Sequence, residues 1–514
     1  MLKYNVSIRL IFLVIVLLIV VTIYGGSTLL ASRFSTGLLV SRYSYLNNKV
    51  ISYNLSGSRV LGAVSEKEKA TSVPVLVYHG VLQEAKESED VSWDDFRDQM
   101  FTLKDNGYET INLNQLEEFL LNGKPLPKKS FLLTFDDGRR DSYYPVDPIL
   151  KALNYKAVMF VLTSQGGDNG PFYLSENELN EMLSTGRWEL QSHSENAHKF
   201  DVTGPNGEMG HWLTNKLWLK DQGRLETNEE YKTRIESDLV KSKEHLEAKY
   251  GVKVTALAFP YGDYGQGDTN YSTSKQVVLD AVRAIYKFGL YQPWGELGER
   301  NYPGKDGFMV RRITVRNTTS VNDLLRIIEN GEDKAVGYTD SFQKDNGWIT
   351  EWGKEDVSDG ALRLRSTDGT SGAVTYLDGT EQWNNFELTA TVALEKDTDS
   401  LSIIARADRF SNYSYCNFGK YSMSYSEIVD GQKVLGNKWS GNFKYSMSNK
   451  VEVGIRVEGG KTTCSMNGVP MVINRNIKIS RGGMIGFSIW SSKANAEAQI
   501  FSLISTPINQ SSRD

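Results

Sequence analysis

Residues 131–138 read Phe-Leu-Leu-Thr-Phe-Asp-Asp-Gly, an apolar run that ends in two adjacent carboxylates. The run predicts a buried β-strand, with Asp136 and Asp137 at its end. Because side chains alternate along a strand, the two carboxylates diverge. One of them can bind a metal ion while its neighbour takes a proton from water on that ion. The alternative is a strand that enters an ordinary Asp-Gly turn.

Two closely spaced histidines favour the metal site. His193 and His198 lie in a polar stretch and are two of only five histidines in the chain. Together with Asp137 they offer one oxygen and two nitrogen ligands, which suits a divalent ion, first of all Zn²⁺, with Co²⁺ and Ni²⁺ as alternatives. Positions left open on such an ion would take water and substrate. The alternative is a pair of surface histidines without a metal.

A third segment ends a predicted strand at residues 254–259 and continues as Pro260, Tyr261 and Gly262. Proline fixes the backbone and glycine allows it to turn, so the amide of Tyr261 could point at a developing oxyanion. Pro260 and Tyr261 are therefore candidates for substrate and oxyanion contacts. An ordinary turn is the alternative.

These three segments resemble the motifs of polysaccharide deacetylases, the NodB-homology proteins of carbohydrate esterase family 4. The resemblance covers about residues 73–315. It implies an α/β catalytic part that folds as a distorted (β/α) barrel, with its site at the C-terminal ends of the strands. It also implies that Asp136 is the general base and that Asp137, His193 and His198 hold the metal.

The spacing of five residues from His193 to His198 is similar to that in the branch that deacetylates biofilm poly-N-acetylglucosamine. Residues 75–81 are similar to the opening strand of the same branch. In such a barrel, His79 would lie near the metal and contact substrate. A structural hydrogen bond from His79 to a loop is the alternative.

Two residues typical of the family are missing from their usual places. The third motif usually begins with an arginine that orients the base, and here Ala258 stands there. Arg311 or Arg312, in a strand-like segment, could replace it, unless these are exposed charges. Most family members also carry a late histidine as general acid, but no histidine follows His245. The general acid is therefore unassigned.

The resemblance implies a metal-dependent hydrolase that removes N-acetyl groups from an extracellular N-acetylhexosamine polysaccharide, either a poly-N-acetylglucosamine-like exopolysaccharide or a cell-wall glycan. An O-acetyl polysaccharide esterase is one alternative. A non-catalytic, membrane-anchored glycan-binding protein is another. The expected partners are the acetylated polymer and an exopolysaccharide synthase complex. The net charge of −5, with no basic run, argues against nucleic acid as a partner.

The N-terminus predicts a membrane anchor. Lys3 and Arg9 precede an apolar run at residues 10–21. We expect residues 1–31 to form an uncleaved transmembrane helix with its N-terminus inside, which places the catalytic part outside the cell. A signal peptide that is removed is the alternative. Residues 32–72, which are polar with scattered apolar side chains, read as an extracellular tether.

The remaining chain is long enough for two domains. We expect the barrel at residues 73–332. Glycine, serine, asparagine and tyrosine become frequent after Val336, and residues 386–392 and 451–457 alternate between apolar and polar. This pattern predicts an all-β sandwich or jelly roll at residues 337–508, similar in style to concanavalin A-like domains and capable of binding glycans.

Both cysteines, Cys416 and Cys464, lie in this second domain. An exported location permits a disulfide, but the bond requires neighbouring strands. Several tryptophans are available either as stacking platforms for sugars or as core residues. They are Trp348, Trp352, Trp383, Trp439 and Trp490.

Overall fold

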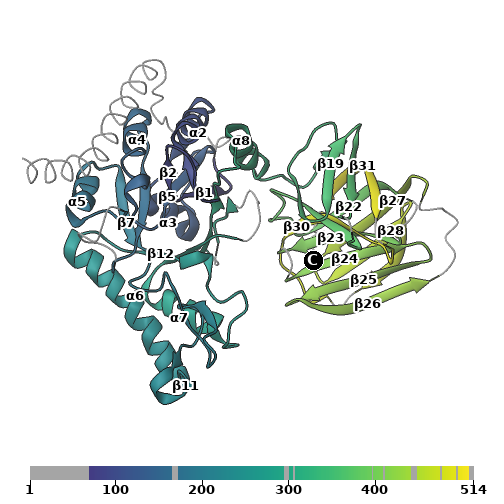
Figure 1. Cartoon of the computed structure of the whole chain (residues 1–514). Coiled ribbons are helices and arrows are strands. Elements are labelled where there is room, and N and C mark those ends of the chain that lie inside the picture. Colours follow the sequence, from purple (N-terminus) through teal and green to yellow (C-terminus); the bar gives the residue numbers. More distant parts are fainter. Residues whose placement is uncertain are drawn as a thin grey trace, which may run out of the picture.

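Figure 1 shows the computed structural model of the chain. The predicted anchor at residues 1–31 and most of the predicted tether lie outside the described residues. Within the described part, no helix is both long and apolar enough to cross a membrane. The structure describes residues 69–164, 172–293, 300–304, 307–367, 369–395, 398–408, 411–440, 448–474, 477–493 and 496–508.

The first region is built on a largely parallel sheet that nearly closes into a barrel. Its central strands are apolar and buried on both faces, as expected when helices cover a parallel sheet. The last strand bends at Arg312, so that β15 pairs with β13 and β16 pairs with β1. This bend brings the two edges of the sheet together. In spatial order the strands are β14 (Arg300–Asn301), β1 (Val73–Tyr78), β5 (Ser130–Phe135), β6 (Ala157–Val161), β7 (Trp188–Ser192), β12 (Ala256–Ala258), β13 (Phe288–Tyr291) and β15 (Met309–Arg311), with β16 (Ile313–Thr314) beside β1 and β4 (Glu109–Thr110) beside β5.

Helices surround this sheet and pack their apolar sides against it. The longest begins with a capping box between Thr227 and Glu230 and ends at Gly251, which adopts the left-handed conformation typical of a helix C-terminus. The helices are α2 (Trp93–Asp105), α3 (Leu113–Asn122), α4 (Asp147–Leu153), α5 (Glu176–Ser184), α6 (Asn228–Tyr250), α7 (Ser274–Ile285) and α8 (Val321–Asn330). Short 3₁₀ turns cover Arg140–Ser142, Lys220–Gln222 and Pro260–Gly262. Three small ladders pair β2 (Val81–Leu82) with β3 (Val91–Ser92), β8 (Phe200–Val202) with β9 (Met209–His211), and β10 (Trp218–Leu219) with β11 (Arg224–Leu225).

The second region is largely β, as the alternating sequence predicts. Two antiparallel sheets contribute to one hydrophobic core. One sheet has the order β19 (Lys354–Ser358), β20 (Ala361–Arg365), β31 (Glu497–Pro507), β22 (Phe386–Leu394), β27 (Val451–Glu458), β28 (Lys461–Met466) and β29 (Val469–Asn474), with β17 (Thr339–Asp340) beside β31. The other has the order β18 (Trp348–Trp352), β21 (Gly372–Leu377), β30 (Met484–Trp490), β23 (Ser400–Ala407), β24 (Tyr413–Gly419), β25 (Ser422–Val429) and β26 (Gln432–Ser440).

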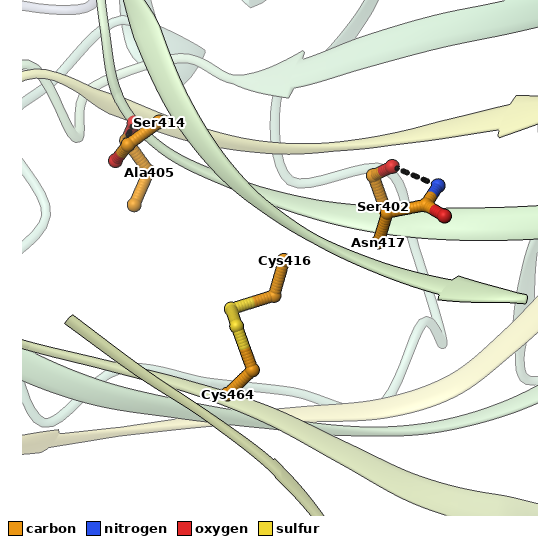
Figure 2. The surroundings of a disulfide bond; sticks show 6 residues. All are labelled: Ser402, Ala405, Ser414, Cys416, Asn417 and Cys464. Atoms are coloured by element: carbon orange, nitrogen blue, oxygen red, sulfur yellow. Dashed lines mark hydrogen bonds between the residues drawn. A yellow bond between two sulfur atoms is a disulfide. The ribbon is translucent and has the colours of Figure 1, made fainter. Parts of the chain in front are cut away.

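A disulfide between Cys416 and Cys464 joins the two sheets (Figure 2). Cys416 belongs to β24 and Cys464 to β28, and their Cα atoms lie 5.7 Å apart. The next residue along β24, Asn417, belongs to the opposite face and donates a hydrogen bond of 3.0 Å to the Ser402 hydroxyl. The pairing that the sequence left open therefore depends on the packing of the sheets.

The tryptophans of this region differ in how far they are buried. Trp348 and Trp383 are 1% and 2% exposed and belong to the core, so they are not stacking platforms. Trp439 packs partly buried against the same core. Trp352 and Trp490 are 56% and 51% exposed. Of these five, the last two present their rings to solvent.

Candidate metal centre and active site

Asp136 follows the end of β5 and is almost completely buried. It accepts two hydrogen bonds from Arg312, which lies between β15 and β16 with its side chain inaccessible to solvent. The distances are 2.7 Å from Nη1 to Oδ1 and 2.8 Å from Nη2 to Oδ2. Burial alone would raise the pKa of Asp136, but the charge of Arg312, followed by that of His193, outweighs it and holds this pKa below its usual value. The carboxylate is therefore fixed and ionised.

Of the two arginines that the sequence offered for orienting Asp136, Arg312 fills this role. The neighbouring Arg311 instead donates a 3.1 Å hydrogen bond from Nε to the Tyr291 hydroxyl. Ala258, where the family usually has its arginine, presents its carbonyl to a histidine. The residue that orients Asp136 thus comes from the last barrel strand.

Asp137 lies beyond the end of β5 and adopts a positive φ of 73°, so a left-handed turn sets the direction of its side chain, and not the strand alternation that the sequence suggested. Its Oδ1 atom lies 3.5 Å from His193 Nε2 and 3.6 Å from His198 Nε2. His193 follows β7, and its Nδ1 lies 2.8 Å from the Ala258 carbonyl. Because a carbonyl only accepts, Nδ1 carries the proton in the neutral ring, and Nε2 offers its lone pair to the Asp137 side.

These three side chains fit a divalent metal ion. Their ligand atoms all lie within 4.8 Å of one another. Asp137 Oδ1 is buried and has no hydrogen-bond partner among the described residues. Tetrahedral coordination at the usual bond lengths separates neighbouring ligands by about 3.3–3.4 Å, close to the spacing seen here. One carboxylate and two imidazoles can therefore hold such an ion with positions open for water and substrate.

A buried aspartate of α6 holds the turn between the two histidines. Asp238 accepts hydrogen bonds from the amides of Glu195, at 3.1 Å, and Asn196, at 2.7 Å. Burial raises the pKa of Asp238 to about 6. No motif in the sequence marks Asp238. Its signal was a charge on the buried face of the helix, between Ile235 and Leu239.

Tyr261 lies between two imidazoles. Its backbone is left-handed, with φ 58° and ψ 13°. Its ring stacks on His198 at a centroid distance of 4.3 Å and on His211 at 4.6 Å, with an interplanar angle of only 4° in the second pair. His211 Nδ1 in turn lies 2.5 Å from the buried Asp263 carboxylate. Pro260 is buried and is not among the cavity residues, so it shapes the backbone before Tyr261.

His79 follows β1 and faces the same site. Its Nε2 lies 3.3 Å from Glu89 Oε2 and 3.9 Å from Asp136 Oδ2. Its Nδ1 is buried without a hydrogen-bond partner among the described residues. His79 therefore lies beside both a loop carboxylate and Asp136, and its contact with substrate stays a prediction.

The side chains meet around a cavity of about 350 Å³. They follow strands that are distant in sequence, and parallel strands bring their C-terminal ends to one rim of the barrel. Two tryptophans that follow His198 in the chain do not line this cavity, since Trp212 is buried and Trp218 is half-buried. The lining residues are His79, Glu87, Ser88, Glu89, Asp90, Asp136, Asp137, Arg139, His193, His198, Tyr261 and Gln292.

The sequence agrees with this geometry. Residues 123–277 match the family model described as polysaccharide deacetylase. This part of the chain matches the polysaccharide deacetylase family, and the acid and histidines of its cavity form a site able to hold a metal.

Named relatives narrow the comparison. The chain is 31% identical, over 203 residues, to the poly-β-1,6-N-acetyl-D-glucosamine N-deacetylase of Escherichia coli K12. That match covers 37% of this chain and 30% of the relative, so the chain spans about a third of the relative's length. A Staphylococcus epidermidis protein of the same name is 24% identical, with 52% of this chain and 83% of that protein covered.

A solved structure of a de-N-acetylase from Aggregatibacter actinomycetemcomitans is 24% identical to this chain. The likeness covers 50% of this chain and 100% of that one, with a TM-score of 0.43. At this TM-score the likeness adds nothing to the family match.

Proposed function

We propose that this protein removes N-acetyl groups from an extracellular polysaccharide of N-acetylhexosamine by metal-assisted hydrolysis. The observation that carries the proposal is the meeting of two differently held carboxylates in one cavity. Asp136 is bound by Arg312 and faces the cavity, whereas Asp137 lies between His193 and His198. This division matches a proton acceptor beside a metal site.

The residues have separate roles in this proposal. Asp137, His193 and His198 hold a divalent ion, most simply Zn²⁺, which would polarise the acetamide carbonyl and make water more acidic. Asp136 takes the proton of the attacking water. Arg312 keeps Asp136 ionised and fixes the plane of its carboxylate, because the guanidinium binds both oxygens.

The oxyanion and the leaving amine need partners as well. Tyr261 lines the cavity in a left-handed backbone, and we assign its amide as an oxyanion donor. His79 faces the same cavity and lies beside Asp136, so we assign it the delivery of a proton to the leaving amine. This fills the role that the sequence left without a residue.

The substrate follows from the relatives. Two of the relatives bear the name poly-β-1,6-N-acetyl-D-glucosamine N-deacetylase, which supports a β-1,6-linked N-acetylglucosamine polymer. An O-acetyl ester would fit the same chemistry and is the second candidate. We place the enzyme outside the cell, anchored by residues 1–31 and working beside a polysaccharide synthase. The apolar N-terminal run supports this location.

We also propose that the C-terminal region is a concanavalin A-like sandwich that binds glycan. Trp352 pairs with Val374, and Trp490 pairs with Gly372 two residues away on the same strand. Both exposed rings therefore belong to one face of the seven-stranded sheet. Exposed tryptophans are suited to stacking on pyranose rings. Replacing both by alanine should reduce retention of the full chain on the polymer.

The test is acetate release by the purified full chain. Proposed substrates are β-1,6-linked N-acetylglucosamine oligomers, with acetylated xylan as the comparison, each with Zn²⁺, Co²⁺, Ni²⁺ or a chelator. Metal-dependent release from the amino-sugar oligomers alone supports the N-deacetylase. Release mainly from xylan supports the esterase. No release by metal-loaded protein from either substrate, with binding retained, supports the glycan-binding protein.

A further inference from the structure

A short hairpin follows the second histidine of the metal site. Strands β8 and β9 pair with Phe200 opposite His211 and Val202 opposite Met209. Directly opposed residues of an antiparallel pair lie on the same face, and so do residues two apart on one strand. These four side chains therefore form one face, which we call the hairpin face.

The hairpin face continues the wall of the cavity. His211 stacks on Tyr261, which lines the cavity. The ring of Phe200 lies 4.6 Å from that of His211 and 5.4 Å from that of Tyr261, tilted by 59° and 56°. The face therefore begins at the metal site, through Tyr261 and His198, and extends away from it through Phe200 to Met209.

The outer part of the face is apolar but exposed. Phe200 is 52% exposed and Met209 is 58% exposed. About half of each of these apolar side chains therefore stays in contact with water instead of being buried in the fold. The inner end is rigid, because His211 is bound to Asp263, and Asp263 accepts a second hydrogen bond, of 2.7 Å, from Thr214.

We propose that the hairpin face is a subsite for the sugar next to the one that is deacetylated, with Phe200 as its stacking platform. The inference rests on the proposed polysaccharide substrate and names where its chain leaves the catalytic cavity. The apolar face of a pyranose matches an exposed aromatic ring, and Met209 extends the contact. Phe200 is not among the residues that line the catalytic cavity, so the subsite favours chains over monosaccharides.

Binding without turnover tests the subsite. The full chain with Asp136→Asn, loaded with Zn²⁺, is titrated calorimetrically with β-1,6-linked N-acetylglucosamine of one to five units. We expect affinity to rise at least tenfold from one unit to four. Adding Phe200→Ala should lower the affinity for the four-unit oligomer about tenfold, and Phe200→Trp in its place should keep the affinity of the parent. Leu121→Ala, which shortens a comparably exposed apolar side chain on α3, should leave the gain unchanged.

The outcomes separate this subsite from the reaction itself. Zinc content and melting temperature of each variant show whether the fold is intact. If the oligomers bind with the Phe200 dependence but the parent chain releases no acetate, the subsite stands and the deacetylase proposal fails. If Phe200→Ala binds the four-unit oligomer as tightly as its parent, or if no oligomer binds, the proposal of this subsite is wrong.

Discussion

Arg312 holds Asp136 through two parallel hydrogen bonds that join residues 176 positions apart in the chain. The planar guanidinium lies against both oxygens of the carboxylate, and the side chains of Arg312 and Asp136 are 0% and 2% exposed. Each carboxylate oxygen keeps a lone pair beyond the one that Arg312 uses. Asp136 can thus be held rigidly and still accept a proton.

Removing the guanidinium should weaken both the fold and the reaction. In Arg312→Met, a buried carboxylate loses its partner, which costs about 3–5 kcal/mol of unfolding free energy. The folded pKa of Asp136 lies below its unfolded value, so its contribution to stability is present above the unfolded pKa and is lost as the pH falls through the folded one. In the variant, the acid limb of the pH–rate profile should move to higher pH. Denaturant unfolding and the pH dependence of acetate release measure the two effects.

Arg311→Met is the matched control, because Arg311 is the next residue and contacts the Tyr291 hydroxyl instead of Asp136. Its acid limb should stay at the parental pH. An unchanged acid limb in Arg312→Met would show that Arg312 does not set the protonation of the base.

Metal binding should release a proton near neutral pH. Burial alone would lower the pKa of His193, but Asp136 and Asp137 outweigh it and raise this pKa above its usual value. Burial and the charge of His193 lower the pKa of His198 to about 4. At pH 6.5, His198 is largely neutral and ready to bind a metal, whereas more than half of His193 carries a proton that the metal must displace.

Calorimetric Zn²⁺ titrations at pH 6.5, in two buffers with different heats of ionisation, measure the released protons. We expect between about half a proton and one proton per zinc, and an affinity that falls about tenfold per pH unit below the His193 pKa. Equal heats in the two buffers would contradict this assignment.

Loss of the Asp238 carboxylate should lower the affinity of the site for zinc. Asp238→Ala removes the acceptor for the amides of Glu195 and Asn196, which hold the turn between the metal-site histidines. Outer contacts of this kind are worth about 10- to 100-fold in metal affinity. Zinc competition with a chromogenic chelator gives the affinity. Glu244→Ala, an exposed position on the same helix, should bind zinc as the parent does, and equal affinities of both variants would refute the role of Asp238.

The sequence predicted the parts of the site that lie at strand ends. Asp136 and Tyr261 come after apolar runs, and parallel strands place such residues on one rim. His193 was recognised instead by its close spacing to His198 in a polar stretch. The choice between Arg311 and Arg312 was beyond the sequence, because a shift of one residue reverses the face of a strand. The bend at Arg312 decides it.

The sequence also did not predict contacts between elements that are distant in the chain. The stack of His211 on Tyr261 depends on a hairpin whose register no local pattern specifies. Likewise, the bond between Cys416 and Cys464 depends on how two sheets face one another. Local chemistry is therefore readable from the sequence, whereas packing partners come only from the folded chain.

The disulfide should stabilise the C-terminal region without affecting the reaction. It closes a loop with a sequence separation of 48. Closing a loop of this length lowers the entropy of the unfolded chain and raises the free energy of unfolding by about 4 kcal/mol. Replacing both cysteines by alanine should lower the melting transition of that region in calorimetry by several degrees. Acetate release at 25 °C should be unchanged, and a matching loss of activity would show that the two regions are coupled.

The most direct test of the account is Asp136→Asn in the full chain, measured at once for zinc content and for acetate release from β-1,6-linked N-acetylglucosamine oligomers. The substitution keeps the size of the side chain, but an amide cannot accept the proton of water at neutral pH. We predict that the variant binds as much zinc as the parent and releases acetate at least a thousandfold more slowly, roughly the range that a positioned base contributes. Acetate release at the parental rate, with zinc bound, would contradict the assignment of Asp136 as the base.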